Sequence, residues 1–473
     1  MKNIKYILTF ILVIVPLDLF SQNNIDWKKI EEETMTHFQA ILRFDTSDPP
    51  GNELPVVEYL KSVLDKEGIE SKIFALDSNR PNLVARIKGS GKKQPLLMMG
   101  HTDVVNVDTA KWTFPPFSAT RSNGYVYGRG TVDDKDNVVS CLMNMILLKR
   151  MKVELDRDVI FLAESGEEGN VKYGIKYMVE NHWDEINAEF CLAEGGGVTR
   201  EGGKNRYAGI QTTEKIPYGI NLISRGPAGH GSRPLKTNAI LHLARAVDKA
   251  SSWRTPMRLN ETTKMFFEKM ALVSDKKIAP LFKNISDGKN LESTQDYFAE
   301  NIPGYYSVLR TSISPNIIKG GYRINVIPSE VVATLDVRAL PDENMTQFLE
   351  TLRGIINDPQ IEVKLSDRDT RPGATPSRLN SEAFSAIEQS IEKFYNVLTI
   401  PTMSTGATDM AYLRQKGVQC YGIGPALDEE DGPKGFSAHS DQERILEESL
   451  HTFVKFQFDL LKRIAGKKNV PVQ

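Results

Sequence analysis

His101 and Asp103 stand two residues apart at the end of an apolar run, and together they could hold a metal ion. Residues 95–99 are typical of a buried parallel strand, so His101 would lie where that strand emerges. Side chains two apart on an extended backbone point to the same side, which lets Asp103 reach the ring nitrogen that a metal leaves free. A metal-bound His usually donates its second N–H to a carboxylate. The pattern alone is short, and an ordinary surface loop can also contain it.

Further acidic residues follow two other apolar segments, 157–164 and 188–193, that are also typical of buried strands. Open α/β sheets bind ligands at the carboxyl edge, where such strands end. Two His and three carboxylates form the ligand set expected of two divalent ions, zinc above all, bridged by one carboxylate. For Glu167 and Glu168 alone, a solvated charge cluster would be the simpler interpretation. The candidates at the strand ends, in a connecting turn and in a late loop are His101, Asp133, Glu167, Glu168, Glu194 and His439.

Short motifs, some of which contain these candidates, occur along nearly the whole chain. They lie at residues 100–105, 112–117, 127–135, 167–168, 194–196, 226–234, 325–328, 336–338 and 439. In order and spacing they resemble the di-zinc exopeptidases and amidohydrolases, the family of carboxypeptidase S, bacterial glutamate carboxypeptidase, aminoacylase and succinyl-diaminopimelate desuccinylase. The arrangement is most similar to the carboxypeptidase S branch.

The resemblance implies a role for each of these residues. Asp133 would bridge two zinc ions, for which cobalt or manganese could substitute, and Asp103 would clamp His101. Glu167 would be the general base. A carboxylate next to a metal ligand in the sequence is held close to the water that the metal activates, so Glu167 could carry a proton from that water to the departing amine. The implied metal ligands are His101, Asp133, Glu168, Glu194 and His439.

Four more residues match substrate-contacting positions of the family. His230, in a Gly-rich turn between a predicted strand and a predicted helix, would donate to the developing oxyanion. Asn325 and Arg338 would reach the terminal carboxylate of the substrate, for which an Arg fork is suited, although their motifs alone are also typical of strand ends. Gly406 would contact the substrate, but Ala407 stands where the family has a second Gly. The implied substrate is a peptide or an N-acyl amino acid with a free carboxylate, cleaved by a carboxypeptidase-like exopeptidase, a dipeptidase or a deacylase.

Alternating helix-like and strand-like segments predict an α/β fold with a mixed-sheet catalytic domain. Near residue 215 the pattern changes to strand pieces and long helical stretches, which predict an inserted α+β lid. We expect a signal peptide at 1–21, a catalytic domain formed by 22–214 and 367–473, and a lid and dimerisation domain at 215–366. The lid could pair with its twin about a two-fold axis through edge strands such as 218–224. A homodimer is therefore expected, with His230 acting across the subunit boundary.

The first residues predict export. A short basic opening precedes an apolar run at 7–20, too short for a comfortable membrane span, which favours a cleavable signal peptide over an uncleaved anchor. Cleavage would leave a periplasmic or extracellular enzyme with no stable membrane partner. The 59 basic and 61 acidic residues nearly balance, which gives no indication of a nucleic-acid partner. Cys141, Cys191 and Cys420 lie in apolar segments and are expected to be buried thiols.

Other functions find less support in the sequence. No Gly-x-Ser-x-Gly elbow of a serine hydrolase occurs, and residues 89–92 lack the earlier Gly of a phosphate-binding loop. A catalytically silent peptide-binding protein on the same fold remains an alternative. Such a protein would need a damaged ligand set, whereas all five implied ligands and Glu167 are present.

Overall fold

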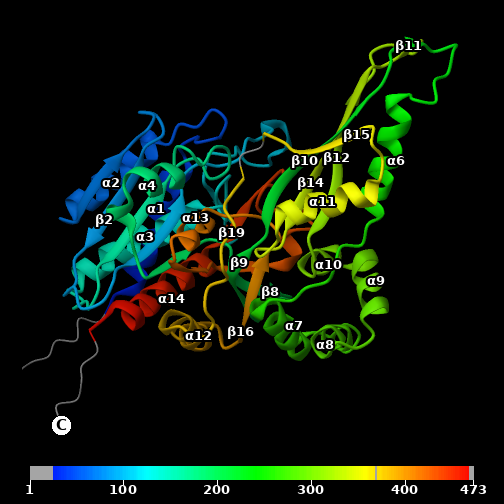
Figure 1. Ribbon diagram of the computed structural model, residues 1–473. Helices are drawn as coiled ribbons and strands as arrows, with labels where there is room; N and C mark the ends of the chain where they lie inside the picture. Colours follow the sequence, from blue (N-terminus) through cyan, green and yellow to red (C-terminus); the bar gives the residue numbers. More distant parts are fainter. Residues whose placement is uncertain (1–24, 368–369, 468–473) are drawn as a thin grey trace, which may run out of the picture.

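The computed structural model describes residues 25–367 and 370–467 and contains a large and a small β-sheet, each covered by helices (Figure 1). The predicted signal peptide lies outside these residues. Within them, no helix combines the length and apolar character needed to cross a membrane.

The large sheet has ten strands and is mixed. Its order is β1 (Glu70–Phe74), β2 (Asn82–Ile87), β6 (Val159–Glu164), β3 (Leu96–His101), β7 (Phe190–Ala193), β17 (Gln419–Gly422), β9 (Lys204–Glu214), β8 (Gly197–Glu201) and β18 (Ala426–Asp428), with β16 (Leu398–Ser404) beside β9. β3 lies between β6 and β7 and is parallel to both. The three strands are fully buried, which explains their continuous apolar runs, and they end at one edge, as predicted.

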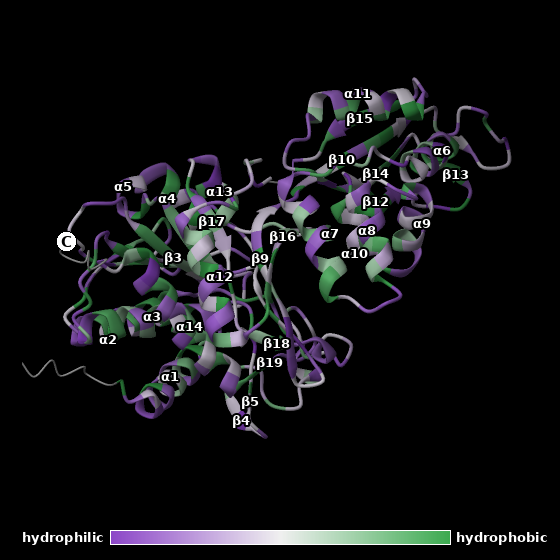
Figure 2. Cartoon of the chain, turned by 90° about the horizontal axis from the view of Figure 1, so that it is seen from below, coloured by the Kyte–Doolittle hydropathy of each residue, from purple (hydrophilic) through white to green (hydrophobic). Residues whose placement is uncertain are grey.

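Two helical layers cover the large sheet, one on each face. The side chains of Leu96 and Met98 pack into one core and those of Leu97 and Met99 into the other, as the alternation of a strand requires. The first layer consists of α1 (Trp27–Leu42), α2 (Leu54–Lys66), α3 (Lys135–Arg150), α12 (Glu382–Tyr395) and α14 (Glu447–Ala465). The second consists of α4 (Ile175–Asn181), α5 (Trp183–Ile186) and α13 (Met410–Gln415). In Figure 2 these helices carry both hydrophilic and hydrophobic residues, as expected of helices with one buried face.

The small sheet, here the lid sheet, is antiparallel. Its order is β12 (Ser312–Gly320), β14 (Glu330–Ala339), β10 (Ile216–Arg225) and β15 (Ile361–Leu365), with α6 (Ala239–Ser252) and α11 (Met345–Ile356) packed against it. The prediction that 218–224 is an edge strand is therefore wrong, because β10 lies between β14 and β15. The fully buried Ile220 and Leu222 give the reason, since a central strand of a covered sheet buries its apolar face. The edge strands are β12 and β15.

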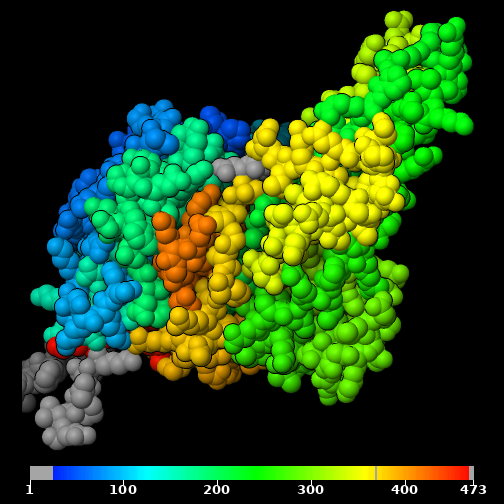
Figure 3. All heavy atoms as spheres, viewed as in Figure 1, coloured from blue at the N-terminus to red at the C-terminus, as the bar shows by residue number. Residues whose placement is uncertain are grey.

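An arm extends from the lid sheet and projects from the body of the molecule (Figures 1 and 3). It consists of residues 226–238 and 321–329, which pair through the short strands β11 (Gly229–His230) and β13 (Val326–Ile327). Tyr322 and Ile324 of the arm and Ile318 at the end of β12 are strongly exposed.

The inserted segment also contributes helices that do not belong to the lid sheet. They are α7 (Glu261–Val273), α8 (Ala279–Asp287), α9 (Leu291–Asn301) and α10 (Pro303–Val308). Their aromatic core packs on Ile400 and Met403 of β16. The segment predicted as a single lid thus contains two packing units, one around the lid sheet and one against the large sheet. A three-stranded sheet of β4 (Thr120–Ser122), β5 (Tyr125–Tyr127) and β19 (Arg444–Leu446) completes the fold.

Candidate active site

Parallel strand ends bring the predicted metal ligands together. His101 ends β3, Glu168 lies in the loop after β6, and Glu194 directly follows β7. The Nε2 atom of His101 lies 3.0 Å from Oδ1 of Asp133. On the other side of the same carboxylate, Nε2 of His439 lies 3.1 Å from Oδ2 of Asp133. The two oxygens of Asp133 therefore face two different imidazoles, which is the arrangement a bridging ligand needs.

Two groups of side chains have the spacing of metal sites, and Asp133 belongs to both. The possible ligand atoms of His101, Asp133 and Glu194 lie within 4.8 Å of one another, as do those of Asp133, Glu168 and His439. In the second group, Nε2 of His439 is 2.9 Å from Oε1 of Glu168. Three protein ligands for each ion leave open positions for water and substrate, as in catalytic zinc sites.

The chemistry of the donors fits a pair of divalent cations. Burial alone lowers the pKa of the His101 imidazole, yet its contacts with Asp103 and Asp133 raise it well above the ordinary value. Hydrogen bonds with Asp133 and Glu168 raise the pKa of His439 to about 10. Burial and repulsion from Glu167 raise the pKa of Glu194 well above the usual range. The negative charge of these closely spaced carboxylates favours the binding of a cation. Imidazole nitrogen together with carboxylate oxygen suits zinc, cobalt or manganese.

Asp103 is fully buried and holds the loop that carries Glu167 and Glu168. Its Oδ1 accepts hydrogen bonds from the backbone N–H groups of Gly166 (2.9 Å) and Glu167 (3.2 Å), and its Oδ2 accepts from that of Glu168 (2.9 Å). The His101 Nδ1 lies 3.6 Å from Oδ1 of Asp103 and 3.1 Å from its backbone oxygen. The sequence predicted only the contact with His101, whereas the structure gives Asp103 a further part in fixing the loop.

A third acidic group, Asp48, Glu53 and Asp103, also has the spacing of a metal site. Here a buried Arg80 supplies the positive charge, because its Nη2 lies 2.5 Å from Asp48 and 2.6 Å from Glu53. We therefore interpret this group as an ion-pair network that supports the loop, not as a metal centre.

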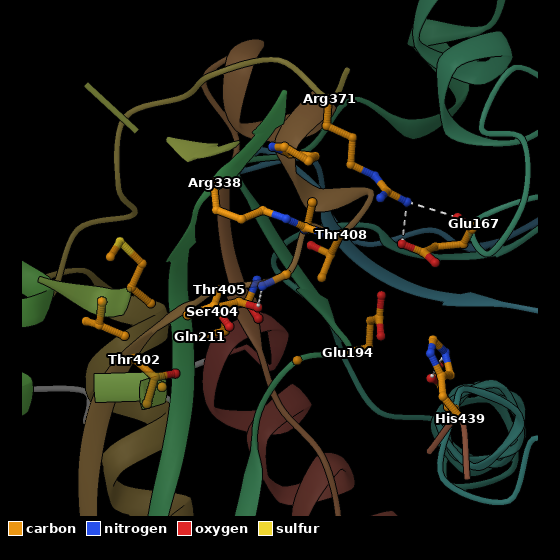
Figure 4. Close-up of a pocket in the computed structure, with 18 of the residues that line it drawn as sticks. Glu167, Glu194, Gln211, Arg338, Arg371, Thr402, Ser404, Thr405, Thr408 and His439 are labelled. Carbon is orange, nitrogen blue, oxygen red and sulfur yellow. Dashed lines mark hydrogen bonds and ion pairs between the residues drawn. The ribbon is translucent and has the colours of Figure 1, made fainter. Parts of the chain in front are cut away.

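Arg371 is a functional candidate that the sequence did not reveal. It donates hydrogen bonds to the backbone oxygen of Glu167 at 3.0 Å, to the Glu167 carboxylate at 2.5 Å, and to Asp409 at 3.1 Å (Figure 4). Burial and the neighbouring Asp409 raise the pKa of Glu167, and the Arg371 guanidinium opposes this rise. No motif surrounds Arg371, so only its position in space relates it to the site.

A pocket of about 820 Å³ opens beside these groups. Figure 4 shows Glu167, Glu194 and His439 on one side of it, Thr402 on the other, and Arg338 between them. Arg338 lies on β14, where its Nε donates to Oδ1 of Asp336 at 3.0 Å and its Nη2 donates to Oδ2 at 3.1 Å. Arg338 and Gly406 both line the pocket, as their predicted substrate contacts require.

His230 and Asn325 do not line this pocket. Both lie on the arm, where the backbone N–H of Gly231 donates to the backbone oxygen of Asn325 at 2.8 Å. The exposed His230 ring is 2.7 Å from the hydroxyl of Ser232. Within the single chain, the arm therefore holds these two predicted substrate-contacting residues away from the pocket that Arg338 and Gly406 line.

The fold and the site define a metallopeptidase or amidohydrolase. Residues 97–463 match the model of peptidase family M20/M25/M40, and the chain belongs to this family. The predicted resemblance, the α/β mixed-sheet fold and the enzyme class are thereby confirmed.

Curated relatives of several kinds are similar over most of the chain. The N-fatty-acyl-amino acid synthase/hydrolase of Homo sapiens is 27% identical over 401 residues, which are 83% of this chain and 76% of the relative. Probable carboxypeptidase S-like 2 of Dictyostelium discoideum is 27% identical, covering 80% of this chain and 74% of its own. A probable succinyl-diaminopimelate desuccinylase of Staphylococcus aureus is 28% identical, covering 69% and 74%.

Solved structures share the fold. The M20 family metallo-carboxypeptidase Sso-CP2 of Sulfolobus solfataricus superimposes with a TM-score of 0.71 at 21% identity, covering 91% of this chain and 98% of its own. A Bacillus subtilis protein described as a dinuclear metal binding peptidase has a TM-score of 0.57 at 14% identity, covering 92% and 98%.

Proposed function

We propose that this protein is a zinc-dependent, carboxypeptidase-like hydrolase of peptides or N-acyl amino acids that have a free carboxylate. The observation that carries the proposal is the pair of three-residue ligand groups that share Asp133, with Glu167 and Arg338 in the same pocket. The names of relatives support the substrate class, since they include a carboxypeptidase S-like protein and an N-fatty-acyl-amino acid hydrolase.

In the proposed reaction, Glu167 takes a proton from the attacking water and later delivers it to the leaving nitrogen. Zinc ions held by the five ligands would polarise the amide carbonyl and acidify the water. Arg371 fixes the Glu167 carboxylate at 2.5 Å, so that the base keeps its orientation before substrate arrives. His439 and Glu168 line the same pocket with Nε2 and Oε1 2.9 Å apart, and the His439 side chain is half-exposed.

Arg338 is the proposed anchor for the free carboxylate of the substrate. Its Nε and Nη2 donate to Asp336, and the Nη1–Nη2 side of the guanidinium can form two parallel N–H···O bonds with a substrate carboxylate. Arg338 also lines the pocket that contains Glu167. Cleavage then occurs at the amide nearest that carboxylate. A dipeptidase or a deacylase would use the same groups, and the three activities differ only in what precedes the scissile amide. A catalytically silent peptide-binding protein would bind the same peptides or N-acyl amino acids without cleaving them.

The test compares two neighbouring glutamates with opposite proposed roles. Glu167→Gln removes the proton carrier, so turnover of a dipeptide and N-acyl amino acid panel should fall by about 10²–10⁴-fold with metal content unchanged. Glu168→Gln and His439→Ala should instead lower the zinc content. Near-normal turnover of zinc-loaded Glu167→Gln would sink the assignment of the base. Wild-type protein that binds zinc yet cleaves nothing on the panel would favour the silent binding protein.

We further propose a homodimer in which the arm carries His230 into the partner's site. The exposed arm, the free edge of β12, and the exposed Ile318 and Tyr322 support this proposal, because such surfaces favour pairing. His230 would then donate to the oxyanion of a substrate held by the other subunit.

Mixing two inactive variants tests this second proposal. In a mixed dimer of His230→Ala and Glu167→Gln chains, one site regains both groups, so activity should reappear after subunit exchange. Exchange is verified separately with two distinguishable tags. If the exchanged mixture stays inactive, His230 does not act across the boundary.

A further inference from the structure

One end of the pocket takes no part in the proposed chemistry and is apolar. Of the described residues that α7, α10 and β16 contribute to the pocket lining, none is charged. We call five of the lining residues, contributed by these elements and the turn before α10, the apolar wall: Phe266, Ile302, Tyr305, Val308 and Met403. Glu167, Glu194 and His439 lie across the pocket from Thr402 of β16, the residue next to Met403 of the wall (Figure 4).

The segment 402–409 runs along the pocket from the apolar wall towards Glu167. Thr402 and Met403 lie at the apolar wall, and Gly406 follows along the lining. Asp409 then reaches Arg371, which binds Glu167. The segment therefore runs from the apolar wall, past the proposed carboxylate site, to the base.

Arg338 lies close to the apolar wall. On β14 it stands opposite Ser312 of β12. The hydroxyl of Ser312 accepts a hydrogen bond from Nζ of the buried Lys215 at 2.9 Å, and the backbone oxygen of Ser307 accepts from the same Nζ at 3.0 Å. Ser307 directly precedes Val308 of the wall. Arg338 and Val308 line the same pocket, so a carboxylate held by Arg338 would let the side chain on the neighbouring α-carbon extend towards the wall.

The wall is backed by a firm aromatic core. The Tyr305 ring lies 5.0 Å from the Phe282 ring, 5.7 Å from Phe266 and 5.8 Å from Phe298, measured between centroids. Phe282 and Phe298 are buried, and Met403 belongs to the same core. A wall fixed in this way keeps its shape when a ligand arrives, which makes it selective.

We propose that the apolar wall binds the side chain of the carboxylate-bearing amino acid, so that the enzyme selects large apolar residues such as Phe or Leu at that position. This inference rests on the proposed function, since it uses Arg338 as the carboxylate anchor. A charged side chain would find no partner at this end and would be rejected.

The first test varies the two halves of the substrate separately. With the acyl group fixed as acetyl, kcat/KM should rise about 10–100-fold from Ala to Phe or Leu and should be lowest for Asp. With the amino acid fixed as Ala, the length of the acyl chain should matter less. Selectivity for acyl length with no selectivity for the amino acid overturns the proposal, because the wall would then hold the acyl group.

Gly304 offers a substitution that fills this end of the pocket without disturbing the core. It lines the pocket, and a Cβ built on it would meet no atom within 4 Å. Gly304→Leu should therefore lower the Phe-to-Ala ratio of kcat/KM by about tenfold. Gly354→Leu is the matched control, because Gly354 on α11 is equally open and lies outside the pocket. Val308→Thr, which keeps the shape and adds a hydroxyl, should lower the same ratio in the same direction. If Gly304→Leu and Val308→Thr both leave the Phe-to-Ala ratio of kcat/KM unchanged, the proposal is overturned.

Binding of the product amino acids separates this inference from the proposed reaction. Calorimetry on the zinc-loaded wild type should show L-Phe binding about tenfold more tightly than L-Ala. If no substrate is cleaved but L-Phe is preferred, the proposed reaction fails and the wall keeps its assignment. If substrates are cleaved but L-Phe and L-Ala bind equally, the wall assignment fails and the reaction stands.

Discussion

The metal-ligand cluster and the arm carry equally clear motifs, yet only the ligand cluster lies at the pocket of the same chain. His101, Asp133 and His439 come from distant parts of the chain and lie about 3 Å apart through one carboxylate. His230 and Asn325 lie together on the arm, away from the pocket. A motif therefore identifies the residues of a site, but it does not say whether one chain contains the whole site.

The cause of this difference is the way each region is built. Three of the five ligands, His101, Glu168 and Glu194, end or follow buried parallel strands whose register fixes where each strand ends. The arm directly continues β10, β12 and β14, and its two segments pair through the two-residue strands β11 and β13 and through the backbone hydrogen bonds from Gly226 to Ser329 and from Gly231 to Asn325. Ligand positions are thus set by the core of one chain, whereas most residues of the arm are exposed.

Outside the metal ligands and Glu167, the largest effect is expected at Arg371, which supports Glu167 from within the same chain. Arg371→Met removes the contacts with Glu167 and Asp409, so kcat should fall about 100-fold while metal content stays unchanged. Arg371→Lys should retain more activity, because it keeps the charge. A loss under twofold in Arg371→Met would show that Glu167 needs no such support.

A smaller effect, and a selective one, is expected at Arg338. Arg338→Ala should lower kcat/KM by about 10–100-fold for substrates with a free carboxylate, since a charged pair is lost. The same substrates amidated at that end should be nearly unaffected. An equal loss for both sets would mean that Arg338 has a structural role in β14.

The smallest effect concerns Lys215, which joins β9 of the large sheet to β10 of the lid sheet. Burial, with nearby Arg338 and Arg310, lowers its pKa to about 7. Between about pH 7 and pH 10 the unfolded chain then binds more protons at Lys215 than the folded chain, so folding gains stability as pH rises, by up to about 1.4 kcal/mol per pH unit.

The Lys215→Met variant has no titratable amine at this position, so it lacks this pH-dependent contribution to stability. Its stability relative to the wild type should be greatest at and below pH 7 and should decrease towards pH 10, as measured by denaturant unfolding at several pH values. A constant difference between the two proteins across that range would show that Lys215 is not buried in a depressed-pKa state.

The sequence placed three of the candidate ligands, His101, Glu168 and Glu194, at or after strand ends, where the structure also has them. The strand-like segments 157–164 and 188–193 coincide with β6 and β7. Cys141, Cys191 and Cys420 are buried free thiols, as predicted. The sequence did not identify Arg371, because its role depends on contacts with Glu167, which lies 204 residues away in the sequence.

The strand at 218–224 was misplaced at an edge, since its burial depends on β15, whose pairing partner the sequence does not specify. The apolar wall was missed for a similar reason. Its residues come from α7, the turn before α10, α10 itself and β16, and only the packing of these segments beside one another brings them to the pocket. The domain boundaries and the homodimer stay predictions.

The most direct test of the account is a metal titration of chelator-treated protein. Hydrolysis of an N-acyl amino acid should be absent without metal and should rise to a plateau at about two zinc ions per chain, as two ligand groups sharing Asp133 require. Glu167→Gln should bind the same amount of zinc without hydrolysis. Full hydrolysis by the metal-free protein, or a plateau of binding with no hydrolysis by the wild type, would contradict the account.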